Sequence, residues 1–176
     1  MMGKVIVYIA QSLDGFIATE DNGIDWLSSV EQANEDYGYG EFIKTVDAVV
    51  MGRKTYDKVL SFGIEFPHKD KKCYVLSNTL TGRDKNVTFY NGSLTELVTS
   101  LKKQYGGNLF IDGGGEVVGE FRAHNLIDGY ILSIIPILLG KGIRLFNDVD
   151  TKNTLKLIES KAFPSGLVQL RYECLK

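Results

Sequence analysis

Residues 49–56 read Val-Val-Met-Gly-Arg-Lys-Thr-Tyr, a short apolar run followed by a glycine, two cations and a hydroxyl. The apolar run predicts a strand buried on both faces, and a helix is expected over residues 53–60. The free N–H groups of a first helical turn attract anions, and Arg53 and Lys54 add full positive charges there. This junction therefore predicts a phosphate site, with a solvated basic turn as the alternative.

Two further junctions resemble the first in placing ligand-binding groups after a strand. Residues 110–117 (Phe-Ile-Asp-Gly-Gly-Gly-Glu-Val) carry three glycines, which let a ligand approach the backbone closely, or simply make a tight turn. They match neither the dinucleotide fingerprint nor a P-loop. Residues 75–79 (Val-Leu-Ser-Asn-Thr) offer hydroxyls and an amide, or a simple turn. Open α/β sheets bind nucleotides at the carboxyl ends of parallel strands, so the three junctions together predict a nucleotide site.

The remaining pattern alternates short β-rich runs with helical periods. Helices are predicted from Ser93, a suitable N-cap, and over residues 116–123. Near the C-terminus, residues 154–162 and 167–174 form two arms, and the second alternates with a period of two, as in a strand with one buried face. We expect one α/β domain over residues 1–176, with a central mixed sheet of about eight strands, helices on both faces and a C-terminal antiparallel hairpin. The other strands are predicted at residues 4–10, 47–51, 73–76, 87–90 and 108–112.

The composition limits the classes of partner. The chain has 176 residues, 44% of them hydrophobic and 24% charged, which is typical of a globular domain. The net charge of −2 gives no support to a nucleic-acid or membrane partner. No signal peptide or membrane span is recognised, and two distant cysteines, Cys73 and Cys174, are typical of a reduced protein, so a cytoplasmic location is expected.

The two histidines give little sign of a metal site. His68 sits in a polar loop and is expected to be exposed, and His124 follows a predicted helix. They are far apart and lack a cysteine or carboxylate cluster, so no metal is expected.

Residues 131–139 form an apolar run interrupted by Pro136. A proline is difficult to keep inside a central strand, so part of the run is expected at a sheet edge, where it would bury its surface in a homodimer. The alternative is that the run is core beneath a helix.

Several of these segments resemble a known superfamily. Residues 51–56 look like the Met-Gly-Arg-x-Thr segment of dihydrofolate reductases, and residues 75–77 and 111–115 follow in the order of that superfamily's other NADPH contacts. Residues 12–18 and 136–142 are more similar to the pyrimidine-reductase domain of riboflavin biosynthesis. The resemblance spans nearly the whole chain. It implies a dihydrofolate-reductase-like three-layer fold and an NADPH-dependent reductase of a small-molecule substrate.

The resemblance also implies cofactor contacts. The cationic junction would hold the cofactor phosphates, residues 77 and 78 would line the adenosine side, and the glycines would pass the pyrophosphate and nicotinamide, with their first pair in a cis peptide. A family position that is often basic is occupied here by an acid, Glu116, which leaves more of the phosphate binding to the first junction. The cofactor-binding residues implied are Ala10, Ile17, Gly52, Arg53, Lys54, Thr55, Ser77, Asn78, Gly113, Gly114, Gly115 and Glu116.

The proton donor is the least defined part of the resemblance. Dihydrofolate reductases place an acid a few residues after a tryptophan, and here Glu31 follows Trp26 by five residues. The Leu-Pro pair usual before that acid is replaced by Ser-Ser-Val in residues 28–30. Glu31 is therefore either the catalytic acid or a solvated carboxylate at a helix start, where it would favour the helix dipole.

The substrate suggested first by the resemblance is 5-amino-6-(5-phosphoribosylamino)uracil. Asp14 and Trp26 would lie at its entrance, and Lys141 and Arg144 would be the cations for its phosphate. Dihydrofolate is the alternative substrate, and an NADPH-binding sensor with little turnover is the alternative to an enzyme. NADPH is favoured over NADH because the extra ribose phosphate needs cations, such as Arg53 and Lys54.

Overall fold

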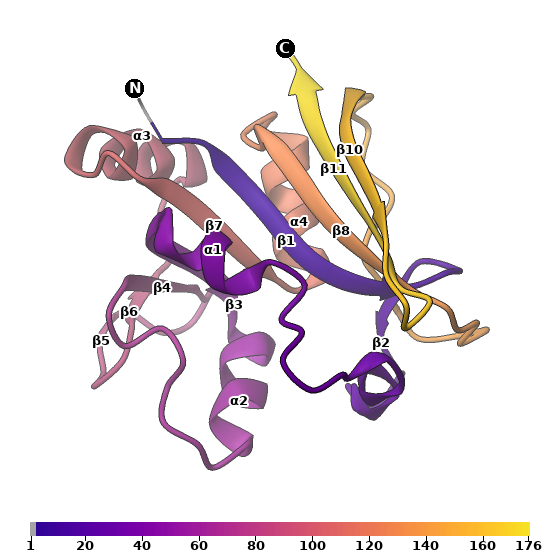
Figure 1. The fold of residues 1–176 in the computed structure, drawn as a ribbon. Helices are drawn as coiled ribbons and strands as arrows, with labels where there is room; N and C mark the ends of the chain where they lie inside the picture. The colour runs from indigo at the N-terminus through magenta and orange to yellow at the C-terminus, as the bar shows by residue number, and fades with distance from the viewer. Residues whose placement is uncertain (1–2) are drawn as a thin grey trace.

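The computed structural model describes residues 3–176, and its strands form one large and one small sheet (Figure 1). Within these residues the large sheet has nine strands rather than about eight, because the two-residue β5 adds to the far edge. The small sheet pairs β2 (Phe16–Ala18) with β9 (Ile143–Arg144). In spatial order the large sheet consists of β10 (Thr154–Ala162), β11 (Val168–Leu175), β8 (Gly129–Ile135), β1 (Val5–Ser12), β7 (Asn108–Gly113), β3 (Val46–Gly52), β4 (Lys72–Leu76), β6 (Thr88–Tyr90) and β5 (Gly82–Arg83).

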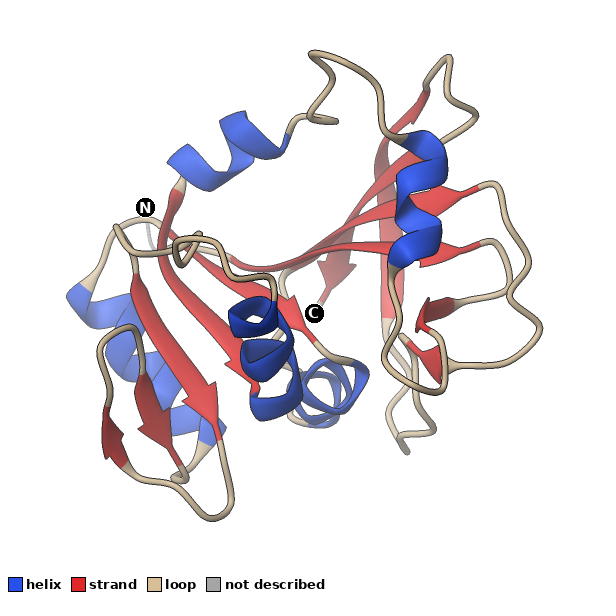
Figure 2. Ribbon diagram, turned by 90° about the horizontal axis from the view of Figure 1, so that it is seen from below, coloured by secondary structure: helices blue, strands red, loops and turns tan. Residues whose placement is uncertain are grey.

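The six strands from β8 to β6 are all parallel to one another, β11 and β5 run the other way, and β10, antiparallel to β11, runs in the same direction as the six. The hairpin β10–β11 pairs antiparallel with β8, and β5 pairs antiparallel with β6. The predicted mixed sheet with a C-terminal antiparallel hairpin at one edge is therefore confirmed. The parallel strands end at the lower edge in Figure 1, and Figure 2 views the molecule from that side.

Helices cover both faces of the large sheet and complete three layers (Figure 2). Helices α3 (Leu94–Gln104) and α4 (Gly115–Ala123) pack their apolar faces on one side, through residues such as Leu101 and Phe121. Helices α1 (Tyr39–Lys44) and α2 (Arg53–Ser61) cover the other, through Phe42 and Tyr56. A short 3₁₀ helix, η1 (Asp25–Val30), lies on the side of α1 and α2.

The helix starts follow the local signals in the sequence. Ser93 caps α3 by accepting a hydrogen bond from the Glu96 N–H, as predicted. Helix α2 begins at Arg53, directly after the strand, and α4 begins one residue before the predicted position. Each strand–helix junction therefore needs almost no connecting loop.

The expectation that the 131–139 run reaches a sheet edge is wrong. Residues up to Ile135 form β8, which is hydrogen-bonded to β1 on one side and β11 on the other. Pro136 follows the last residue of the strand, where a missing N–H breaks no ladder bond. Ile131, Leu132 and Ile135 are buried core residues of this monomer.

Within residues 3–176, no helix has both the length and the apolar composition needed to cross a bilayer.

Candidate functional site

The three predicted junctions lie side by side, because β7, β3 and β4 are neighbours in the sheet and parallel. Gly52 ends β3, and a Cβ built on it would lie 3.8 Å from the Gly114 backbone nitrogen. The first and second junctions therefore touch each other. Their helices, α2 and α4, both begin at this edge, and neither N-cap residue carries a side chain that bonds the first turn. Two sets of free N–H groups are available to one anion.

The cations of the first junction are already paired with carboxylates. The Arg53 Nε donates to both carboxylate oxygens of Asp57, at 2.8 and 2.9 Å. The Lys54 Nζ lies 3.3 Å from Glu116 Oε1, in a pair whose side chains are about four-fifths exposed. Exposed ion pairs of this kind contribute at most about 1 kcal/mol, so a ligand phosphate can replace the carboxylate.

The glycine turn of the second junction is shaped by close contacts. Gly113 has a φ of 103°, which favours glycine, and the Gly113–Gly114 peptide is cis, as the resemblance implied. A Cβ on Gly114 would lie 3.6 Å from Thr55 Oγ1 and 3.9 Å from Ile17 Cδ1. A Cβ on Gly115 would lie 2.2 Å from the Arg144 carbonyl oxygen, so glycine is needed for α4 to pack against β9.

The third junction is a turn closed by its own serine. Ser77 Oγ accepts hydrogen bonds from the N–H groups of Thr79, at 3.3 Å, and Leu80, at 3.0 Å. Asn78 is exposed beside it. Ser77 therefore has a structural role in this turn whether or not it also contacts a ligand.

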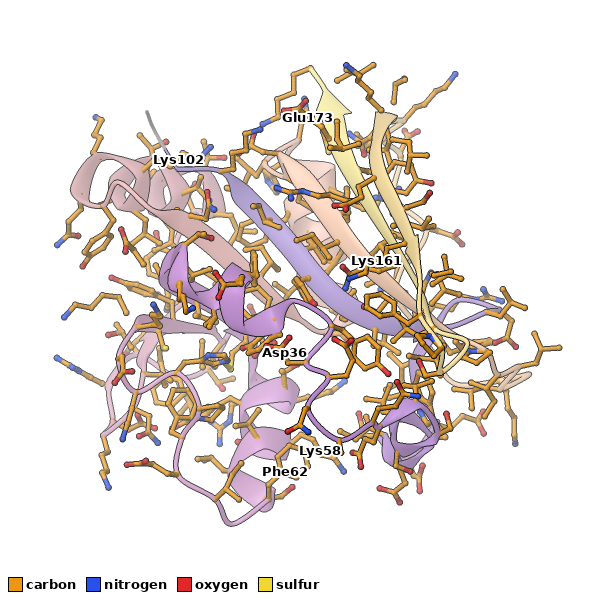
Figure 3. All side chains as sticks on the ribbon, in the orientation of Figure 1. Asp36, Lys58, Phe62, Lys102, Lys161 and Glu173 are labelled. Atoms are coloured by element: carbon orange, nitrogen blue, oxygen red, sulfur yellow. The ribbon has the colours of Figure 1, made fainter. Side chains whose placement is uncertain are left out.

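A cavity of about 600 Å³ opens on the α1 and α2 side of the sheet. Its floor comes from strands β1 and β8, and its outer wall from the segment between η1 and α1. Figure 3 labels Asp36 in this segment, in front of the sheet. The residues lining the cavity are Tyr8, Ala10, Leu27, Val30, Glu31, Gln32, Ala33, Glu35, Asp36, Tyr37, Ser133, Ile135 and Leu167.

The wall of the cavity carries three acids that differ in the hydrogen bonds they accept. Asp36 accepts hydrogen bonds from the N–H groups of Gly38 and Gly40, which lower the pKa of its carboxyl. Glu35 accepts one from the Tyr37 N–H at 2.7 Å. Glu31 lines the cavity and its side chain is exposed. No Lys or Arg is among the described residues that line the cavity, so its charge is negative.

Glu31 does not stand at the start of a helix, and that structural expectation is wrong. It follows the last residue of η1 in an extended conformation. Residues Asn34, Tyr37 and Gly38 have φ values near +60° to +85°, so no continuous helix can form before Tyr39. Whether Glu31 acts in catalysis stays a prediction.

A hydrogen-bonded network supports the floor of the cavity. Gln169 Nε2 lies within 3.2 Å of Tyr8 Oη, the Tyr37 carbonyl and Ser133 Oγ. The Tyr8 hydroxyl donates to the Tyr37 carbonyl at 2.8 Å. Burial raises the pKa of Tyr8, so this hydroxyl stays protonated and fixes the outer wall on the sheet.

The predicted substrate residues Asp14, Lys141 and Arg144 lie on adjoining segments, because β2 pairs with β9, but they lie outside the cavity lining. Lys141 Nζ pairs with Glu20 at 2.9 Å, and the Arg144 guanidinium lies 4.7 Å from the Phe16 ring centroid. Asp14 holds the 139–140 loop by accepting from the N–H groups of Leu139 and Gly140, and these bonds with that of Ser12 lower the pKa of its carboxyl. None of the three lines the cavity.

Trp26 packs in the apolar cluster behind the cavity. Its neighbours there include Val30, Ile135 and Leu167, which do line it. The indole therefore supports the wall of the cavity.

His68 was expected to be exposed, and this is wrong. Its side chain is 3% exposed, and Nε2 lies 3.1 Å from Asp112 Oδ2. It lies edge-on between the Phe66 and Phe110 rings, at 5.7 and 5.9 Å between centroids. The polar residues of the loop gave no sign of this burial, although the nearby Phe66 is buried as well. The available signal was Asp112, a carboxylate that follows three apolar strand residues, 109–111.

The fold is shared with dihydrofolate reductases and related enzymes. A dihydrofolate reductase from Enterococcus faecalis, complexed with NADP(H), matches with a TM-score of 0.71 at 17% identity, over 100% of this chain and 99% of that one. A Thermotoga maritima diaminohydroxyphosphoribosylaminopyrimidine deaminase/5-amino-6-(5-phosphoribosylamino)uracil reductase matches with a TM-score of 0.73 at 17% identity, over 99% of this chain and 57% of that one. These similarities define a dihydrofolate-reductase-like fold.

The chain belongs to the RibD C-terminal domain family, whose model matches residues 3–169. It is 42% identical to Bacillus subtilis (strain 168) YwjB, itself uncharacterized, over 98% of each chain. A Shewanella sp. PV-4 protein with a provisional riboflavin-biosynthesis name matches with a TM-score of 0.91 at 36% identity, over 98% of this chain and 99% of that one. The resemblance in the sequence motifs is thereby confirmed at the level of family and fold.

Proposed function

We propose that this chain is an NADPH-dependent reductase of a small planar heterocycle. The meeting of the glycine turn and the cavity at strand β1 carries the proposal. The cavity is lined by Tyr8 and Ala10 of β1, and β1 pairs directly with β7, the strand that ends at Gly113. A cofactor at the strand ends and a substrate in the cavity would therefore meet across β1.

The residues at the strand ends fit a phosphorylated dinucleotide. The two uncapped helix starts offer N–H groups to the diphosphate. Any side chain at position 114 would fill the space between Thr55 and Ile17, and glycine leaves that space open. Arg53 and Lys54 supply cations for a ribose phosphate, which favours NADPH over NADH. NADPH supplies a hydride to an electrophilic carbon when bound, while the protein orients the two reactants and excludes water.

The cavity favours a heterocycle without a phosphate. The phosphoribosylaminouracil reduced by the Thermotoga enzyme is the first substrate suggested by the family, but Lys141 and Arg144 lie outside the cavity lining. The acids at the wall, Glu31, Glu35 and Asp36, would repel a phosphate. We therefore rank the dephosphorylated aminopyrimidine above its phosphate ester.

Dihydrofolate is the second candidate substrate, favoured by the position of Glu31. This acid lines the cavity, where it can face the amino-substituted edge of a pterin. The repulsion of its glutamate tail by the other wall acids argues against dihydrofolate.

Two measurements test the proposal. Calorimetric titration should show NADPH binding, and NADPH oxidation at 340 nm should then appear with one member of a panel containing dihydrofolate and 5-amino-6-ribosylaminouracil with and without its 5′-phosphate. Absence of NADPH binding at millimolar concentration would contradict the proposed enzymatic function. Binding without oxidation across the panel would favour a sensor.

We also propose a homodimer, formed through β10. All nine residues of this edge strand are exposed, including Leu155, Leu157 and Ile158 at 37%, 50% and 49%. An exposed apolar edge strand is a template for pairing with another chain. Light scattering at micromolar concentration should give twice the monomer mass, and Leu157→Lys should restore the monomer. A monomer in the unsubstituted protein would overturn the dimer.

A further inference from the structure

Ser133 is a buried polar side chain on the floor of the cavity. It is 5% exposed, and it lies in one row with Ala10 of β1 and Gln169 of β11, because β8 pairs with both strands at this position. Ala10 and Ser133 both line the cavity. Burying a hydroxyl costs free energy unless it is hydrogen-bonded. The Ser133 hydroxyl therefore needs partners for its proton as well as for its lone pairs.

The Gln169 amide provides a partner for the lone pairs of Ser133 and none for its proton. The Tyr37 carbonyl can only accept, so the Gln169 atom that lies 3.0 Å from it is the NH₂ nitrogen, a donor. The same nitrogen lies 3.2 Å from Ser133 Oγ, which accepts from it. Among the described residues, Ser133 Oγ has no second hydrogen-bond partner, so its proton is left for a ligand.

The other hydroxyls that line the cavity are already engaged as donors. Tyr8 Oη donates to the Tyr37 carbonyl at 2.8 Å, and the Tyr37 hydroxyl donates to the Val30 carbonyl. The Gln32 side chain is exposed on the outer wall, away from the floor. Among the described lining residues, Ser133 is therefore the side chain of the floor whose proton a ligand can accept.

We propose that Ser133 is a specificity-determining residue, and that its hydroxyl donates to an oxo oxygen of the bound heterocycle. This inference rests on the proposed function and adds the orientation of the substrate to it. A planar ring that lies over the Ala10 methyl group presents its edge to Ser133. An exocyclic oxygen projects from that edge with its lone pairs in the plane of the ring, where a carbonyl oxygen prefers to accept.

The two sides of the cavity then recognise different groups of one substrate. Ser133 donates from the floor, whereas the wall presents carboxylates, which accept. Glu35 receives the Tyr37 N–H on one of its two oxygens, so the other oxygen can accept from an amino group of the ligand. The substrate class is an amino-substituted oxo-heterocycle, with its oxo edge on β8 and its amino edge toward the outer wall.

Calorimetric titration of the protein alone with two pyrimidines tests the inference. The first, 5,6-diaminouracil, carries oxo groups, and the second, 2,4,5,6-tetraaminopyrimidine, carries amino groups in their place. Ser133→Ala should weaken binding of diaminouracil about 10-fold, the value of one hydrogen bond to a buried acceptor, and should change the affinity for tetraaminopyrimidine at most about twofold.

Two further variants separate ligand recognition from support of the floor. Ser133→Thr keeps the hydroxyl and should keep the wild-type difference between the two pyrimidines. Ser100→Ala, at an exposed position of α3 on the opposite face of the sheet, is the matched control and should have wild-type affinities. Ser133→Ala should fold, because the two amide hydrogens of Gln169 still have the Tyr37 carbonyl and Tyr8 Oη as acceptors.

Three results would overturn the inference. If Ser133→Ala weakens both pyrimidines equally, the residue only supports the floor. If the affinity for diaminouracil is unchanged in this variant, the hydroxyl does not contact the oxo group. Absence of diaminouracil binding to the wild-type protein at millimolar concentration would show that the cavity does not take this class of ligand.

These titrations contain no cofactor, so their result is separate from that of the reductase function. Failure of NADPH to bind the wild-type protein defeats the reductase function, even where Ser133 selects the oxo ligand. NADPH oxidation with a member of the substrate panel, together with equal weakening of the two pyrimidines by Ser133→Ala, defeats only the assignment of Ser133.

Discussion

The two binding regions of the sheet are built in opposite ways. At the ends of β3, β4 and β7, backbone N–H groups, glycines and cations meet, so this region suits an anion. Over β1 and β8, a cavity is walled by three acids, with no Lys or Arg among its described lining residues. β1 lies between them in the sheet order. Because the two regions differ in this way, we expect cofactor binding and substrate binding to respond to different substitutions.

The substitution expected to have the largest effect breaks the contact between α4, which starts at the strand-end region, and β9 of the small sheet. Gly115→Ala places a Cβ 2.2 Å from the Arg144 carbonyl oxygen, and both partners are backbone. Overpacking of this kind costs about 1–3 kcal/mol or more. Urea denaturation should show the loss of stability. Gly106→Ala, which meets nothing within 4 Å, is the control. Equal stability of the two variants would show that α4 and β9 separate freely.

The next substitution addresses the cationic strand-end region alone. Arg53→Ala should weaken NADPH binding about 10- to 100-fold, the value of a charge-assisted hydrogen bond to phosphate, and NADH binding much less. Calorimetric titration of both dinucleotides checks the ratio. Asp57→Asn, which frees Arg53 from its carboxylate partner, should act in the opposite direction. Equal weakening of both cofactors would mean that Arg53 does not recognise the extra phosphate.

A third substitution addresses the cavity side alone. Gln169→Leu removes the amide that supports Tyr8, the Tyr37 carbonyl and Ser133, and should destabilise the fold by about 1–2 kcal/mol. NADPH affinity should stay at the wild-type value, because Gln169 contacts none of the three junctions. Thermal unfolding and titration measure the two effects. A parallel loss of NADPH affinity would show that the regions are coupled through β1.

The smallest effect concerns pH. Hydrogen bonds lower the pKa of Asp14 in the folded state, so its stabilisation is present above the ordinary carboxyl pKa and is lost as pH falls through the lower folded value. Asp14→Asn should therefore lower the melting temperature slightly at pH 7 and leave it unchanged at pH 2. Melting curves across this range check the prediction, and a difference that grows toward low pH would contradict it.

The structure of the strand-end region could be predicted from the sequence because it is formed by local segments. The first two junctions are each a strand, glycine and a helix in immediate succession, and the third is a strand followed by a serine turn, so residues such as Gly52 and Ser77 signal their own structure. Parallel strands then bring the junctions to one edge. The roles implied for Arg53, Lys54 and Thr55 stay predictions, since no bound cofactor tests them.

The substrate region could not be predicted in the same way because distant segments form it. The cavity brings Tyr8 together with Tyr37 and Ser133, and no pattern along the chain marks these residues. Lys141 appeared available for a phosphate, yet its partner is Glu20, over a hundred residues earlier. His68 was misjudged for the same reason, since its burial depends on Phe110 of a later strand.

The two cations of the strand-end site carry their own counter-ions, and this affects selectivity. In the proposed function, an incoming phosphate would replace Asp57 at Arg53 and Glu116 at Lys54, so it would exchange one anion for another instead of meeting unpaired cations. Simple anions such as chloride gain little from that exchange, whereas a dinucleotide also engages the helix N–H groups and the glycine turn. Added salt screens the internal pairs as well as the ligand, so binding should depend on ionic strength less steeply than two unpaired cations would produce.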